Sequence, residues 1–145
     1  MHYHPYMCQC PHCTHARMYN YGGAPSYQTQ SGHTRHGHMV LKDYGPHPFT
    51  INIHEAAKQN KTFRTALWSG PHLQVTLMHI EVGEDIGLEL HHDVDQFLRI
   101  EQGQGIVQMG KNKELLDYTI AISDDSAIFV PKGTWHNVIN TGHIP

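Results

Sequence analysis

Short apolar segments, each closed by a turn, fill the chain after residue 48 and constrain its fold most. Glycine, proline, aspartate and serine mark the turns, as at 83–87, 123–125 and 131–133. Many short strands at such spacing favour a β-sandwich or a β-barrel. We expect strands at 49–53, 63–68, 73–82, 88–91, 96–101, 106–109, 118–122, 127–130 and 135–139, with one or two helical turns at 55–60.

The first 48 residues have a different composition. They are rich in Gly, Tyr, Gln, Ser, His and Pro and show no apolar periodicity, a pattern typical of irregular chain. With 145 residues in all, the sequence has room for one domain of ordinary size. We therefore predict a flexible tail at 1–48 and a single barrel at 49–145.

Charge and hydropathy exclude several classes of protein. No stretch approaches the length of about 20 consecutive apolar residues that a membrane-spanning helix needs. No basic run followed by an apolar run marks a secretion signal. The net charge of −3 comes without a cationic face, which nucleic-acid binding would need. We expect a cytoplasmic protein without nucleic-acid or membrane partners.

The segment 131–140 reads Pro-Lys-Gly-Thr-Trp-His-Asn-Val-Ile-Asn. It resembles the second motif of the cupin superfamily, which runs Gly, five residues, Pro-x-Gly-x-x-His, three residues, Asn. Only the leading Gly is replaced, by Asp125. Cupins are double-stranded β-helices, so the resemblance implies an all-β jelly-roll barrel with one short N-terminal helix. It also implies that His136 is a metal ligand.

The segment 87–105 resembles the first cupin motif less closely. Gln96 stands seven residues before Gly103, where the family has Glu, and this alignment puts Glu89 at the first His position and His91 at the second. Side chains two apart on a strand share one face, as a joint site requires. The resemblance implies one divalent transition metal, Mn, Fe, Zn or Ni, held by Glu89, His91, Gln96 and His136.

Other interpretations of these residues remain open. Taken alone, a Glu and a His on a strand mostly face solvent. A cupin can also have lost its metal, because Gln96 carries one negative charge fewer than the Glu of the family, although Glu89 restores a carboxylate. Arg99 is a weak candidate for substrate binding. We expect the other neighbours to be structural: Asp95 solvated, Phe97, Phe129 and Trp135 in barrel packing, and Gly103 and Gly105 in a turn.

Cysteine occurs only in the tail, as Cys8, Cys10 and Cys13. Together with His12, these thiols are secondary candidates for binding Zn(II) or Cu(I), although a single run lacks the second half of a zinc finger. A disulfide would leave one of the three thiols unpaired. A flexible tail that binds metal adventitiously is the third interpretation.

The resemblance is closest to single-domain bacterial cupins described as mannose-6-phosphate isomerase-like. Those relatives continue past the Asn-Thr-Gly turn with at least one more strand, so we expect a truncated barrel whose open edge is covered in a homodimer. One barrel hosts many functions. Three classes stay open: a metal-dependent isomerase or oxygenase-type enzyme acting on a small molecule such as a sugar phosphate, a non-catalytic metal- or ligand-sensing module, and a structural coat-type protein. A phosphate would need cations, for which the candidates are Arg64, Arg99 and Lys132.

Overall fold

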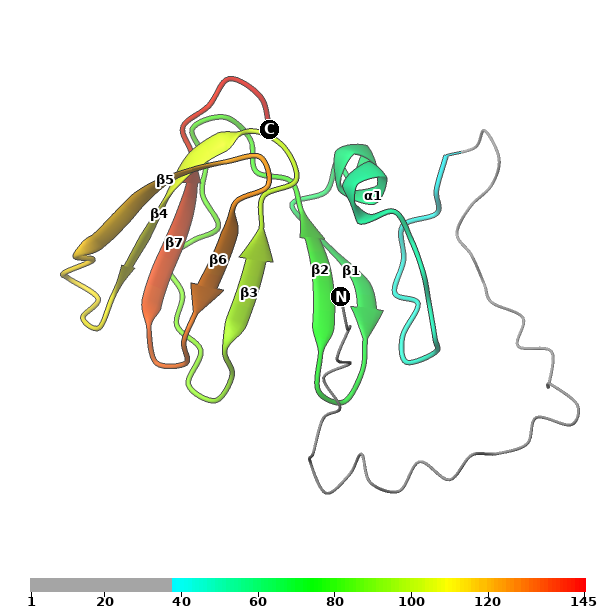
Figure 1. Ribbon diagram of the computed structural model, residues 1–145, viewed down its shortest axis with the longest axis horizontal. Coiled ribbons are helices and arrows are strands. Elements are labelled where there is room, and N and C mark those ends of the chain that lie inside the picture. The colour runs from blue at the N-terminus through cyan, green and yellow to red at the C-terminus, as the bar shows by residue number, and fades with distance from the viewer. Residues whose placement is uncertain (1–37) are drawn as a thin grey trace, which may run out of the picture.

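The computed structural model describes residues 38–145, which form two β units. The elements are α1 (Ile53–Gln59), β1 (Arg64–Ser69), β2 (Gln74–Met78), β3 (Gln96–Arg99), β4 (Gln104–Gly110), β5 (Tyr118–Ser123), β6 (Ala127–Val130) and β7 (Trp135–Asn140). The first unit is the β1–β2 hairpin with α1 beside it, and the second contains two sheets, ordered β3-β6 and β5-β4-β7 (Figure 1). This mostly β architecture with one short helix confirms the expected all-β jelly roll.

The helix α1 begins where it does because Asn52 caps it. The Asn52 side chain accepts a hydrogen bond from the backbone N–H of Glu55 at 3.2 Å, as N-cap residues do. The strand expected at 49–53 is therefore wrong: Phe49 and Ile51 pack against a small apolar cluster, and Ile53 is already helical. No helix within residues 38–145 is long and apolar enough to cross a membrane.

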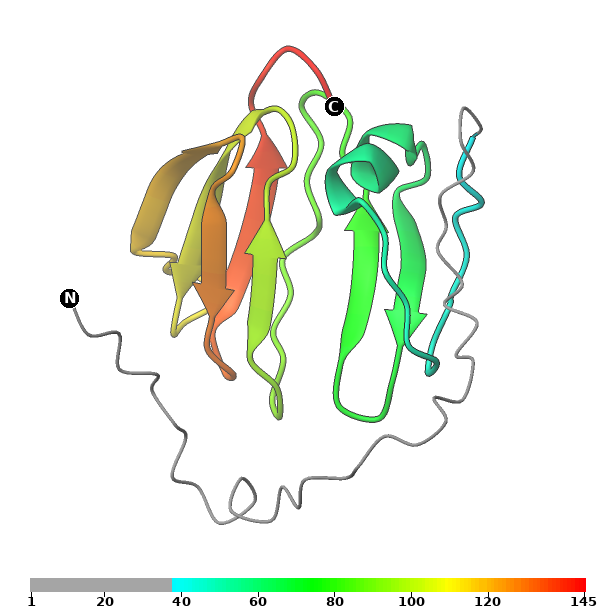
Figure 2. The same ribbon diagram turned by 45° about the vertical axis from the view of Figure 1, so that its right-hand side comes forward.

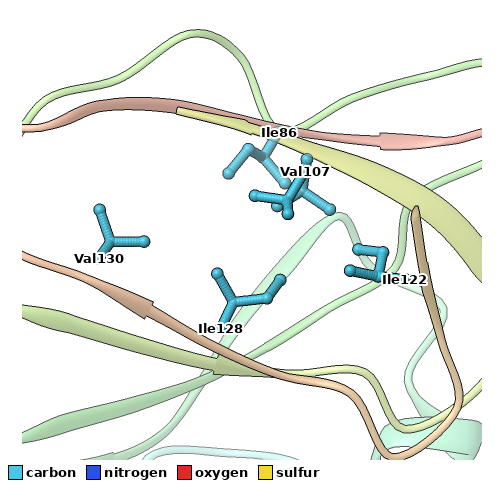
Figure 3. Close-up of a cluster of buried hydrophobic side chains, with 6 residues drawn as sticks. Ile86, Val107, Ile122, Ile128 and Val130 are labelled. Carbon is cyan, nitrogen blue, oxygen red and sulfur yellow. The ribbon is translucent and has the colours of Figure 1, made fainter. Parts of the chain in front are cut away.

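The main core lies between the two sheets of the second unit. Figure 3 shows Ile86 and Val107 on one side of this core and Ile128 and Val130 on the other, with Ile122 at one end. Val107 of β4 is paired in register with Val138 of β7, so the inner face of β7 also points into the core. The buried members are Ile86, Val107, Ile122, Ile128, Val130 and Val138.

A smaller core holds the N-terminal unit together. Leu67 of β1 and Leu77 of β2 are buried in it, and Met39 and Leu41 pack against it from the chain before α1. The described end of the predicted tail therefore contacts this unit, which lies beside β3 in both views (Figure 2). The boundary at residue 48 stays a prediction, and residues 1–37 lie outside the described part of the chain.

Two expectations about individual residues are wrong. Gly105 lies in β4 and not in a turn, and a Cβ there would stand 2.3 Å from the carbonyl oxygen of Ile139 on the neighbouring strand. Phe97 and Phe129 are 59% and 70% exposed, with ring centroids 5.2 Å apart. They are cross-strand partners on the outer face of the β3-β6 sheet, because the adjacent positions occupy the inner face. Barrel packing thus does not use these two rings.

Candidate metal centre

Glu89 and His136 lie directly opposite each other. The segment 88–91, expected to be a strand, makes only an isolated antiparallel bridge from Glu89 to His136 on β7. The backbone N–H of each residue donates to the carbonyl of the other, both at 3.0 Å. The side chains of two directly opposed residues in an antiparallel pair point to the same face. His136 is two residues from the core residue Val138, so both side chains point to the barrel interior.

His91 is held next to this pair by the turn that precedes β7. Its carbonyl accepts a hydrogen bond from the N–H of Gly133 at 2.7 Å, and Gly133 has a φ of +69°, which glycine adopts without a steric cost. The N–H of Lys132 donates to Asp95 Oδ1 at 2.9 Å, so Asp95 has a structural contact beyond solvent. The turn therefore ties the segment carrying His91 to the start of the strand carrying His136.

The side chains of Glu89, His91 and His136 converge. Glu89 Oε1 lies 3.5 Å from His136 Nε2 and 3.9 Å from His91 Nε2. One possible ligand atom from each of the three residues lies within 4.8 Å of the others. The His136 side chain is 0% exposed, whereas that of His91 is 37% exposed. The cluster is therefore compatible with metal binding and reaches solvent on the His91 side.

Two atoms of this cluster lack the partners that buried polar atoms need. Among the described residues, Glu89 Oε1 and His136 Nε2 are buried without a hydrogen bond, a condition that costs about 1–3 kcal/mol per group. His136 Nδ1 lies 3.1 Å from the carbonyl oxygen of Thr134. A proton on Nδ1 donated to that carbonyl leaves a lone pair on Nε2, the form that a metal ligand requires. A cation between the two atoms would satisfy both.

Gln96 carries a third unpartnered atom. In the β3-β6 sheet Gln96 is paired with Val130, a member of the main core, so its side chain faces the barrel interior. Its Oε1 is buried and has no hydrogen-bond partner within residues 38–145. Gln96 thus comes to the interior from the opposite sheet, as a fourth ligand would, and its assignment as a ligand stays a prediction.

The other predicted residues lie away from this cluster. The Arg99 side chain lies on the outer face of β3, where it forms ion pairs with Glu101 at 3.0 Å and with Asp125. Arg64, on β1, is nearer: its Nη2 is 3.8 Å from Glu89 Oε2. No local pattern in the sequence links these two residues, which come from different units of the fold. The tail candidates Cys8, Cys10, Cys13 and His12 lie outside the described residues.

A sequence model of the cupin domain matches residues 76–145. The matched stretch contains the facing sheets and all four predicted ligands, whereas α1 and Arg64 precede it. The class of protein follows from this match and from a relative that aligns over the whole chain. The jelly-roll fold and the inward cluster of Glu and His agree with it. The chain belongs to the cupin family.

Three proteins show how far the similarity extends. The uncharacterized protein YrkC of Bacillus subtilis (strain 168) is 53% identical over 158 residues, which cover 100% of this chain and 84% of YrkC. The uncharacterized protein L612 of Acanthamoeba polyphaga mimivirus is 37% identical over 95 residues, covering 66% of this chain and 58% of L612. The crystal structure of BH2720 from Bacillus halodurans has 57% identity and a TM-score of 0.72, covering 72% of this chain and 80% of that one. The mannose-6-phosphate isomerase-like subtype and the truncation stay predictions.

Proposed function

We propose that this cupin holds one divalent transition metal inside its barrel, through Glu89, His91, Gln96 and His136, and uses it to bind a small molecule. One observation carries the proposal. Within the described residues, Glu89 Oε1 and His136 Nε2 are buried, 3.5 Å apart and without hydrogen bonds. A carboxylate and an imidazole in that arrangement lack only a shared cation.

The donor set narrows the choice of metal. Two imidazoles, one carboxylate and one neutral amide oxygen suit Mn(II), Fe(II), Ni(II) or Zn(II) and leave positions open for water or a ligand. A bound dication would supply Lewis acidity to a carbonyl or hydroxyl of that ligand. The chain's own part is to present the Nε2 lone pair of His136, held by the Thr134 carbonyl, and to bury the ligands from competing water.

Sugar-phosphate isomerisation is a narrower form of this proposal. Its support is Arg64, the one cation with a contact to the cluster among residues 38–145, since Arg99 is engaged with two carboxylates on the outer face. Non-catalytic metal or ligand sensing is the second candidate. It is favoured because the ionisable groups of the cluster, Glu89, His91 and His136, are all used as ligands, so that none of the three remains as a general acid or base.

Metal analysis of two full-length proteins tests where the metal binds. We expect about one equivalent of dication in the wild type and the same amount after the triple substitution Cys8→Ser, Cys10→Ser, Cys13→Ser, because the barrel donors are nitrogen and oxygen atoms. Both proteins should be stripped with a chelator, reloaded with Mn(II), Co(II) or Zn(II), and measured by elemental analysis after desalting. Loss of all metal from the triple variant would place the site in the tail and refute the barrel site.

We also propose a homodimer, because one edge of the barrel is uncovered within residues 38–145. β5 pairs with β4 on one side only, as the sheet order β5-β4-β7 shows. Tyr118 and Ile120 of β5 are paired with Met109 and Val107 on the inward face, yet are 49% and 46% exposed. Exposed edges and apolar patches of this kind commonly mark contact surfaces.

Light scattering tests the dimer. We expect twice the mass of one chain for the wild type. The same mass is expected for the control Thr119→Asp, because the side chain of residue 119 lies on the outer face of β5. Ile120→Asp should shift the equilibrium to monomer, because it buries a charge in the contact. A monomeric wild type at micromolar concentration would show that this edge is simply solvent-exposed.

A further inference from the structure

Arg64 stands beside the proposed metal site although it belongs to the N-terminal unit. Its Nη2 is 3.8 Å from Glu89 Oε2, whereas Glu89 Oε1 is turned toward the imidazoles of His136 and His91, at 3.5 and 3.9 Å. The carboxylate therefore lies between the guanidinium and the two imidazoles. The side chains of Arg64 and His91 both reach solvent, so a ligand that approaches a metal at Oε1 from the His91 side meets a partly exposed guanidinium across the same carboxylate.

The contact with Glu89 leaves most of the guanidinium unsatisfied. A charge-assisted hydrogen bond between Arg and a carboxylate is about 2.7–2.9 Å long, and the distance of 3.8 Å is well beyond it. The Arg64 side chain is 52% exposed. Within residues 38–145 it has no second acidic partner, in contrast to Arg99, which contacts both Glu101 and Asp125. The planar fork of Arg64, with its five donors, is thus available to a ligand.

The charges of the site favour a negatively charged ligand. With a dication bound, Glu89 contributes one negative charge and Arg64 one positive charge, while neutral imidazoles and the Gln96 amide contribute none. The cluster and Arg64 then carry a formal charge of +2. A cleft of one sign raises the local concentration of the opposite ion. A small anion would compensate this excess where a neutral sugar would not.

The geometry points to a small organic acid as the ligand: we propose that Arg64 binds its carboxylate beside the metal. The inference rests on the proposed metal site. A guanidinium fork matches a carboxylate in a two-point hydrogen-bonded pair. A phosphate dianion would also match the formal charge of +2, but Arg64 is the one cation among residues 38–145 in contact with the cluster, and its fork pairs two oxygens, the number that a carboxylate has. Arg64 would then select the ligand without holding the metal.

A purely structural role for Arg64 makes a different prediction. In that case the pair with Glu89 only ties β1 to the barrel, and an exposed ion pair of this kind contributes little to stability. Its loss would lower stability slightly and leave ligand affinity unchanged. Ligand affinity therefore separates the two roles.

The test uses the full chain loaded with Co(II), whose visible spectrum reports on ligand binding independently of any activity. The probes are glycolate, its uncharged amide glycolamide, benzoate and inorganic phosphate. We expect Arg64→Gln to weaken glycolate and benzoate binding about tenfold, equivalent to about 1.4 kcal/mol, and to leave glycolamide binding and Co(II) content unchanged. Arg64→Lys should recover part of the affinity, and Lys61→Gln, at an exposed neighbouring position, should match the wild type.

Each other outcome has a distinct meaning. A wild-type protein that takes up no Co(II) refutes the proposed metal site itself. With Co(II) bound, three results overturn the role of Arg64: carboxylate affinity unchanged in Arg64→Gln, no binding of either carboxylate by the wild type, or loss of Co(II) from Arg64→Gln. Phosphate binding that exceeds carboxylate binding and depends on Arg64 would overturn the assignment of the ligand class. Thermal unfolding of each variant identifies a loss of folding.

Discussion

Replacement of His136 by alanine is expected to weaken divalent metal binding by about a hundredfold or more. Structural Zn(II) sites with four protein ligands bind the metal with about 10–16 kcal/mol in zinc-finger peptides, or roughly 3 kcal/mol per ligand. Each 1.4 kcal/mol is about a tenfold change in affinity. The His136 side chain is 0% exposed, so no other group of the chain can move easily into its place. Competition with a chromophoric chelator measures the dissociation constant, and elemental analysis measures the metal content.

Matched variants separate loss of a ligand from loss of the fold. His136→Ala also removes a buried ring, which lowers stability, whereas His91 is 37% exposed and its replacement should cost little stability. His91→Ala is therefore expected to lose metal affinity to a similar extent while its unfolding temperature without metal stays near that of the wild type. His72→Ala, in an exposed turn between β1 and β2, should keep full affinity. Wild-type affinity in both His136→Ala and His91→Ala would rule out the barrel site.

Local patterns predict most of the fold, and their resemblance to the two cupin motifs predicts the residues of the cluster. Turn residues and apolar alternation give the approximate positions of the strands, and a spacing of two places the side chains of Glu89 and His91 on one face. The Pro-x-Gly-x-x-His pattern indicates His136 as a ligand through its resemblance to the second cupin motif. These features are local, because each depends on a few consecutive residues and on the backbone geometry that they adopt.

Features that depend on contacts between distant segments could not be predicted. The bridge between Glu89 and His136 and the approach of Arg64 to Glu89 are set by how separate elements pack, and no spacing in the sequence encodes them. The same reason explains the outward position of Phe97. Its aromatic character favours a strand but does not say which face of the sheet the ring occupies. That face follows from the pairing of the preceding residue, Gln96, with the core residue Val130. The position of Gly105 in β4 also depends on a contact across strands, the close approach of Ile139, which no local pattern in the sequence predicts.

Gln96→Glu is expected to strengthen dication binding about tenfold to a hundredfold. The Gln96 side chain faces the interior, and its Oε1 is buried without a hydrogen bond within residues 38–145. A carboxylate in its place would add one negative charge to the donor set. At an effective dielectric constant of about 20, two unit charges about 4 Å apart gain about 4 kcal/mol, of which desolvation of the carboxylate removes a large part.

The same substitution should weaken the protein when no metal is present. The new carboxylate would be buried in the barrel interior without a partner, and an unsatisfied buried charge costs at least about 1–3 kcal/mol. Unfolding in urea should therefore show a less stable apoprotein and a larger stabilisation by added Mn(II) or Zn(II) than in the wild type, since a ligand stabilises the state that it binds. Gln104→Glu, at an exposed outward position of β4, should change neither quantity. Equal effects of the two substitutions on metal affinity would mean that Gln96 does not contact the metal, leaving Glu89, His91 and His136 as the ligands.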